Sequence, residues 1–160
     1  MKKLKIYLDT SVINFLFAED APDFKKATEE FFKTYSHLYE LYISDVVLLE
    51  LNKTPDLMHR KKLLKVIDNI SVQILALRDD EVLKKLISSY HKEKVIPLKK
   101  KEDALHIALA TIHEMDILLS WNFKHLANIR KQIAINAINE REGFLKKLYL
   151  LSPLEVEYED

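Results

Sequence analysis

The chain has 160 residues, 48% of them hydrophobic and 31% charged, which is enough for a globular protein to bury a core without disulfides. It has no cysteine, so disulfide scaffolds, thiolate zinc sites and cysteine nucleophiles are excluded. It has one glycine, whereas average usage of about 7% would give roughly eleven, and this excludes glycine-rich dinucleotide and phosphate loops. No apolar run exceeds four residues, so we expect a cytoplasmic protein with no membrane span or signal peptide.

The 25 basic and 25 acidic residues cancel, but they are distributed unevenly along the chain. Four of the acids lie in the last six residues: Glu155, Glu157, Glu159 and Asp160. The rest of the chain therefore carries a small basic excess, which permits a polyanionic partner without requiring one.

Hydrophobic spacing predicts a chain in which short strands alternate with helices. Strand-like apolar segments lie at residues 3–8, 41–43, 71–75, 95–96, 117–120 and 148–150. Helical patterns start at residues 10–11 and cover residues 23–39, 45–53, 57–67, 79–92 and 101–114, with short helical stretches from 122 to 142. Ser44 or Asp45 is the expected cap of the third of these helices, and Gly143 terminates the last helical stretch.

Alternation of strands and helices with short links predicts an α/β fold whose parallel sheet has helices on both faces. No internal repeat, low-complexity segment or linker interrupts the pattern. We therefore expect a single domain over residues 1–160, in which residues 128–160 form a C-terminal helix, a last strand and an acidic tail.

Polar side chains just after the predicted strands mark the candidate site, because ligands of open α/β sheets bind beyond the carboxyl ends of the strands. Asp9 follows the first strand, Glu50 lies on the helix after the second, and Asp103 lies near the start of the late helix. Ser120 and Asn122 follow a later strand. Carboxylates gathered at one edge repel each other unless a cation relieves them, and oxygen ligands suit Mg²⁺ or Mn²⁺.

Four motifs, taken in order, resemble those of PIN-domain proteins. They are YLDTSVIN at residues 7–14, ISDVVLLE at residues 43–50, DALHIA at residues 103–108 and LLSWNFKHL at residues 118–126. The resemblance covers about residues 4–127. It implies a PIN-like, Rossmann-like fold and a metal-dependent ribonuclease, of the VapC-like kind found as toxins in type II toxin–antitoxin pairs.

Carried over position by position, the resemblance implies Asp9, Glu50 and Asp103 as catalytic metal ligands for Mg²⁺ or Mn²⁺. It implies supporting or additional ligand roles for Thr10, Ser11, Ser120 and Asn122. Asn122 stands where the family has a fourth acid, so its carbonyl oxygen can bind a metal but brings no charge, and a second cation should bind more weakly. Asp116 begins a strand, and we expect it at the opposite end of the sheet.

The reaction that the resemblance implies is metal-assisted hydrolysis of an RNA phosphodiester bond, with Glu50 completing the anionic pocket or orienting the attacking water. Sequence position alone suggests which side chains contact RNA: Lys99, Lys100, Lys101, His106, Lys124 and His125. Such contacts would make RNA affinity fall as salt rises. The implied partners are RNA and an antitoxin protein.

Simpler structural roles are open for each site residue. Asp9 can cap the following helix, Glu50 can pair with Lys53, and Asp103 can be an acid favoured by the helix dipole. Asn122 can be a turn residue.

Two functional alternatives are open as well. A catalytically weak or inactive PIN fold would act as an RNA- or protein-binding module, and Asn122 motivates this alternative. A phosphotransfer enzyme of the haloacid-dehalogenase type also has an Asp after its first strand, but it needs a second Asp where this chain has Ser11.

Aromatic residues between positions 23 and 42 exceed what one helix face needs to pack on a core. They are Phe24, Phe31, Phe32, Tyr35, Tyr39 and Tyr42. We expect some of them to form a homodimer or partner surface.

Overall fold

The computed structural model describes residues 2–78 and 80–156, and its strands form one five-stranded parallel sheet. The strands are β1 (Lys5–Leu8), β2 (Glu40–Ser44), β3 (Val72–Leu75), β4 (Ile117–Leu119) and β5 (Tyr149–Leu151). Their order across the sheet is β3-β2-β1-β4-β5. Tyr7 of the central β1 is in register with Tyr42 of β2 on one side and with Leu118 of β4 on the other. The predicted parallel α/β sheet is thereby confirmed.

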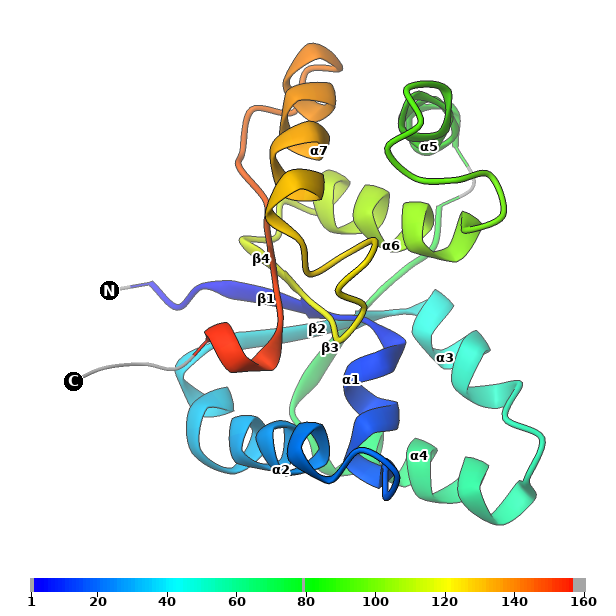
Figure 1. Cartoon of the computed structure of the whole chain (residues 1–160), viewed down its shortest axis with the longest axis vertical. Coiled ribbons are helices and arrows are strands. Elements are labelled where there is room, and N and C mark those ends of the chain that lie inside the picture. Colours follow the sequence, from blue (N-terminus) through cyan, green and yellow to red (C-terminus); the bar gives the residue numbers. More distant parts are fainter. Residues whose placement is uncertain (1, 79, 157–160) are drawn as a thin grey trace.

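Helices cover both faces of this sheet (Figure 1). They are α1 (Thr10–Asn14), α2 (Pro22–Glu30), α3 (Asp45–Asn52), α4 (Leu57–Asn69), α5 (Glu81–Lys92), α6 (Lys101–Ile112) and α7 (Ile129–Arg141). In Figure 1, α1 to α4 lie on one side of the sheet and α5 to α7 on the other. Over the described part of the chain, no helix combines the length and apolarity needed to cross a bilayer.

Two predicted segments are shorter or differently built than expected. The helix predicted over residues 23–39 ends as α2 at Glu30 and continues as a π-helical turn (Phe31–Tyr35) and a 3₁₀ turn (Ser36–Leu38), which keep Phe31 buried against the neighbouring aromatic rings. The strand predicted at residues 95–96 is a bend, because the amides of both residues donate back to the carbonyl of Tyr90 and close the end of α5.

The C-terminal region contains the expected helix and last strand, and it differs from the prediction in one respect. Instead of short helical stretches between residues 122 and 142, the chain forms the single helix α7. The Asn128 side chain caps it by accepting hydrogen bonds from the amides of Arg130 and Lys131. Gly143 ends it as predicted, with a φ of +96° that only glycine adopts without strain. The predicted helix start at Asp79 and the acidic tail at residues 157–160 lie outside the described residues.

Strand order positions the candidate site. From β1 the chain winds outward to β2 and β3, and it then crosses back to β4 and β5 on the other side of β1. The carboxyl ends of β1 and β4 are therefore the switch point of the sheet, which is where ligands of open α/β folds bind. Ile6, Tyr7 and Leu8 of β1 are fully buried, so the residue that follows them, Asp9, is held by the core.

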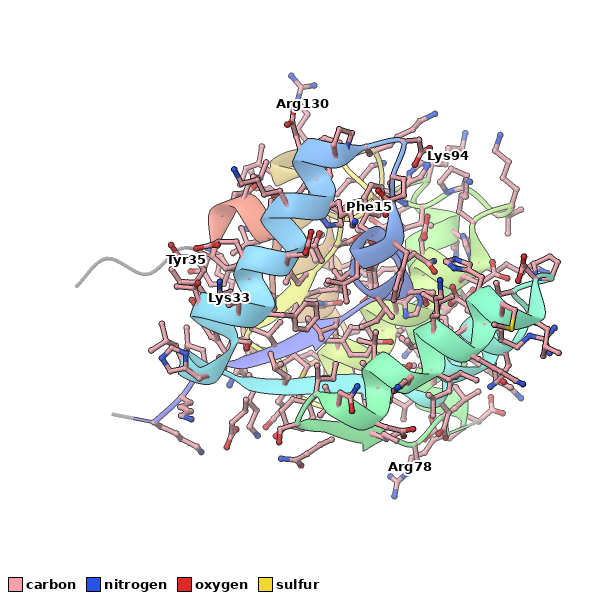
Figure 2. All side chains as sticks on the ribbon, turned by 90° about the horizontal axis from the view of Figure 1, so that it is seen from below. Phe15, Lys33, Tyr35, Arg78, Lys94 and Arg130 are labelled. Carbon is pink, nitrogen blue, oxygen red and sulfur yellow. The ribbon has the colours of Figure 1, made fainter. Side chains whose placement is uncertain are left out.

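The aromatic residues that we expected on a partner surface all pack at least partly into the molecule. Phe31 and Tyr42 are buried, and Phe32, Tyr35 and Tyr39 are half-buried against the core. Phe24 contacts Trp121 and Phe15, and Figure 2 shows Phe15 between α1 and α2. Homodimer formation stays a prediction that these aromatic residues do not support.

Candidate active site

Asp9 lies at the switch point and is only 4% exposed. It caps α1 through the amide of Val12, and both of its carboxylate oxygens accept a short hydrogen bond from a serine: Oδ1 from Ser11 Oγ and Oδ2 from Ser120 Oγ, each 2.5 Å. Burial raises the pKa of Asp9, because a desolvated carboxylate is costly, although His106 and the two hydroxyls oppose the shift. The expected capping role and the site role therefore coexist in one side chain.

The two serines are fixed in turn by the loop after β4. Ser11 Oγ accepts from the amide of Trp121 (2.9 Å), and Ser120 Oγ accepts from the amide of Asn122 (2.9 Å). Since each hydroxyl accepts from a backbone amide, its proton is free to point at Asp9. These hydrogen bonds around Asp9 therefore connect the carboxyl ends of β1 and β4.

Glu50 lies on α3, partly buried, and accepts a 2.7 Å hydrogen bond from His106 Nε2 on α6. Burial acts to raise the pKa of Glu50, but the hydrogen bond and charge of His106 outweigh it and lower the pKa. Lys53, the partner that a purely structural role would give it, adds a smaller attraction. Thr10 also favours the ionised form of Glu50, although its buried Oγ1 makes no hydrogen bond of standard geometry within the described residues.

Asp103 lies in the first turn of α6 and is paired with Asn122. The Asn122 Nδ2 donates to Asp103 Oδ2 (3.2 Å), while its Oδ1 accepts from the amides of Lys124 (3.2 Å) and His125 (3.1 Å). Because the carboxylate can only accept and the two backbone amides can only donate, a single orientation of the Asn122 side-chain amide satisfies all three. Asn122 is therefore both a turn residue and the partner of Asp103, and the oxygen that would bind a metal is used by the turn.

His106 is at the centre of the cluster. It is 2% exposed, and its pKa is raised because attraction to Glu50, Asp9 and Asp103 outweighs burial, which alone would lower it. Burial also raises the pKa of Asp103, against the charges of His125, His106 and Lys100. The charges of all three carboxylates predicted from the sequence therefore act on one histidine, which is hydrogen-bonded to Glu50.

The expected RNA contacts divide into two groups. Lys99, Lys100, Lys101 and Lys124 are exposed, whereas His106 and His125 are buried. Burial lowers the pKa of His125, and the charges of Lys131, Lys124 and Lys100 lower it further while Asp103 opposes the shift. Asp116, excluded as a ligand, accepts from the amide of Lys5 at the start of β1, the opposite end of the sheet.

The donor set fits a hard divalent cation in its chemistry, because it offers carboxylate and hydroxyl oxygens and no sulfur. The side chains are not closed around one point: within the described residues, no three acids or histidines come close enough to hold a metal ion. Each carboxylate is satisfied instead by its own partner, namely serine hydroxyls, an imidazole or an amide.

A family model of the PIN domain matches residues 6–131, which is most of the chain. The chain belongs to the PIN-domain family. A solved structure with a similar fold is VapBC2 from Rickettsia felis bound to a DNA fragment from their promoter, at 14% identity and a TM-score of 0.54, over 93% of this chain and 98% of that one. No curated protein matches the sequence.

Two residues of this PIN domain reach the cluster although the sequence did not predict them. Tyr7 Oη is hydrogen-bonded to His106 Nδ1 (2.6 Å) and to Ser44 Oγ (2.7 Å), and both Tyr7 and Ser44 are fully buried. The available signal was a tyrosine in the central strand, two residues before Asp9. A buried hydroxyl needs a partner, but the sequence does not say which residue supplies it.

Proposed function

We propose that this PIN domain is a metal-dependent ribonuclease that hydrolyses RNA phosphodiester bonds, with Asp9, Glu50 and Asp103 holding Mg²⁺ or Mn²⁺. The observation that carries the proposal is a set of hydrogen bonds at the switch point of the sheet: Asp9 and Asp103 are both bonded to the loop after β4, and Glu50 is bonded to His106, one helical turn after Asp103. The mutual repulsion of these three carboxylates favours a cation at this edge. Membership of the PIN-domain family supports the same activity.

The chain's own residues divide the work. Asp9 is held by one serine hydroxyl on each carboxylate oxygen, from Ser11 and from Ser120. Glu50 is ionised and oriented by His106, so it can hold or orient a water. Exposed Lys100 and Lys124 can bind RNA phosphates near Asp103. The chemistry that a divalent cation supplies at such a site is polarisation of a phosphoryl oxygen and a lowered pKa for a bound water.

We also propose that the chain acts as the toxin of a type II toxin–antitoxin pair and binds an antitoxin protein. The similar fold of VapBC2, over almost the whole of both chains, supports this assignment. Coexpression with the protein encoded by the adjacent reading frame, followed by size-exclusion chromatography and an RNA cleavage assay, tests it. A stable complex with suppressed cleavage is expected, and a neighbour that neither binds nor inhibits argues against the pair.

Cleavage of a labelled single-stranded RNA tests the nuclease. We expect cutting with Mn²⁺, none with EDTA, and a loss of at least about 100-fold in Asp9→Asn and in Asp103→Asn, because each variant removes a charged ligand. Asp116→Asn is the matched control, since that carboxylate lies at the opposite end of the sheet. Cutting that survives EDTA, or that survives both variants, would overturn the proposed mechanism.

A PIN domain that binds RNA without cutting it is a second candidate, favoured by one observation: Asn122 brings no charge and its oxygen is used by the turn. RNA binding followed by fluorescence anisotropy in EDTA separates the two. A pure binding module keeps full affinity without metal and cuts nothing with Mn²⁺. In either case Lys100→Ala should weaken binding and reduce the salt dependence by about one ion.

A further inference from the structure

A buried chain of hydrogen bonds leads from the core to Glu50. Ser44 Oγ is bonded to Tyr7 Oη (2.7 Å), Tyr7 Oη to His106 Nδ1 (2.6 Å), and His106 Nε2 to Glu50 Oε1 (2.7 Å). Ser44, Tyr7 and His106 are 0%, 0% and 2% exposed, so water does not compete for these bonds. Only the last member, Glu50, reaches the site's surface.

Ser44 takes part in this chain of hydrogen bonds instead of capping α3 with its side chain. It is the N-cap residue of α3, with extended backbone angles, but its side chain makes no capping hydrogen bond. A serine at this position normally bonds the amides of the first turn, which stabilises a helix by about 1 kcal/mol. Its hydroxyl is bonded to Tyr7 instead, so a tertiary contact replaces the local one.

The direction in which these hydrogen bonds are donated is set by Glu50, the last of the four residues. A carboxylate only accepts, so His106 Nε2 carries a hydrogen and donates to Glu50. With a neutral imidazole, Tyr7 donates to Nδ1 and accepts from Ser44; with an imidazolium, Tyr7 accepts from Nδ1 and donates to Ser44. Because the phenol can do both, the bond to Glu50 is kept in either protonation state.

The chain also connects the elements that carry the three carboxylates. Tyr7 lies on β1 just before Asp9, Ser44 lies at the start of the helix that carries Glu50, and His106 lies one helical turn after Asp103. These hydrogen bonds therefore tie the strand before Asp9 and the helices that carry Glu50 and Asp103 to one another.

We propose that His106, and Tyr7 and Ser44 through it, are positioning residues that fix the Glu50 carboxylate for metal binding, with Oε1 held by His106 and the other oxygen left for the cation. This inference rests on the proposed metal site. Outer hydrogen-bond partners of metal-ligating groups typically change metal affinity by about 10–100-fold when removed.

Four variants test the positioning role: Tyr7→Phe, His106→Leu, His106→Gln and Tyr90→Phe. Tyr7→Phe deletes one oxygen and keeps the ring, and His106→Gln keeps an N–H where Nε2 lies. Tyr90→Phe is the matched control, because Tyr90 is also fully buried and its hydroxyl is bonded to Asn139 (2.5 Å), away from the carboxylates. Mn²⁺ affinity is measured by titration calorimetry, and the His106 ring nitrogens are followed by NMR in the metal-free protein.

We expect Tyr7→Phe and His106→Leu to weaken Mn²⁺ binding by about 10-fold or more, His106→Gln to restore it to within about 3-fold, and Tyr90→Phe to leave it unchanged. The ring ¹⁵N shifts of His106 should report an Nε2–H tautomer or imidazolium and should move in Tyr7→Phe and in Glu50→Gln. Equal loss in Tyr90→Phe, or full affinity in Tyr7→Phe and His106→Leu, would overturn the positioning role. A wild-type protein that shows these NMR responses but binds no Mn²⁺ would instead overturn the proposed function.

Discussion

At the scale of single residues, the three carboxylates of the site differ in the partner that holds each of them. Asp9 is held by neutral hydroxyls, Glu50 by an imidazole and Asp103 by an amide. Burial raises the pKa of Asp9 and of Asp103, whereas at Glu50 the hydrogen bond and charge of His106 outweigh burial and lower the pKa. Two of the three are therefore costly to ionise in the metal-free protein.

Asp9→Asn should stabilise the metal-free protein at neutral pH, by on the order of 1 kcal/mol, because it removes a buried charge and keeps an oxygen for capping α1. The sign follows from the raised pKa of Asp9. The native state is penalised above that pKa, and the penalty fades as the pH falls through it toward the unfolded value of 3.8. Urea unfolding in EDTA across this pH range should show the gain shrinking with acidification; a gain that grows would contradict the assignment.

Asn122→Asp should have opposite effects with and without metal. The variant keeps the oxygen that accepts from Lys124 and His125, but it places a second oxygen where Nδ2 donated to Asp103 at 3.2 Å. We expect a loss of about 1–3 kcal/mol in unfolding free energy in EDTA at neutral pH, and tighter Mn²⁺ binding with faster RNA cleavage. Urea unfolding measures the change in stability, and calorimetric titration measures the Mn²⁺ affinity. Unchanged stability in EDTA would mean that the contact between Asn122 and Asp103 does not stabilise the fold.

At the scale of elements, α7 covers the β5 edge of the sheet. Alternate residues of β5 bond to β4, which leaves the backbone groups of Leu148 and Leu150 facing outward. Gln132 Oε1 accepts from the amide of Leu150 (2.9 Å), and Asn136 both accepts from the amide of Leu148 (2.9 Å) and donates to its carbonyl (2.8 Å). Two helix side chains thus take the place of a sixth strand and block edge pairing.

Asn136→Ala should lower the unfolding free energy by about 2–3 kcal/mol, because it leaves a buried amide and carbonyl without partners. Asn52→Ala is the matched control: Asn52 is exposed and donates to the carbonyl of Leu48 one turn earlier, so a change within about 0.5 kcal/mol is expected. Urea denaturation followed by circular dichroism measures both variants. Equal effects would show that the edge of β5 needs no cover.

At the scale of the whole molecule, the parallel strand order brings distant parts of the chain to one edge. Asp9 and Ser120 are 111 residues apart in sequence, and His106 and Glu50 are 56 apart, yet each pair is hydrogen-bonded. A cation bound among these carboxylates would connect both halves of the sheet, so its binding energy would be available against global unfolding.

Mn²⁺ should therefore raise the melting temperature of the wild-type protein. At a free concentration about 100 times its dissociation constant, a single ion adds about 2.7 kcal/mol, or about 5–10 °C for a chain of this size. Asp9→Asn and Asp103→Asn should lose most of this shift, and Ca²⁺ in place of Mn²⁺ tests for a mere charge effect. An equal shift in all variants would indicate binding elsewhere.

The sequence by itself predicted the sheet, its carboxyl-edge acids and the PIN family. The sheet follows from local rules, namely apolar segments of strand length and helical spacing, whereas the family came from the resemblance of four motifs. Asp9 was selected because it follows the first strand, Glu50 because it lies on the helix after the second, and Asp103 because it opens the late helix; their role as metal ligands came from the resemblance. Local rules failed where packing decides the backbone, as at the π-helical turn after α2 and the bend at residues 95–96.

Only the tertiary structure decided which partner each acid has. A carboxylate in a sequence can be satisfied by any hydrogen-bond donor that the fold brings near it, and the donors found here come from other elements: Ser120 for Asp9, His106 for Glu50 and Asn122 for Asp103. For the same reason the sequence could not reveal that Tyr7 would reach His106. Hydrogen bonds need alignment within a few tenths of an ångström, and that alignment is set by how the sheet and its two helical layers pack.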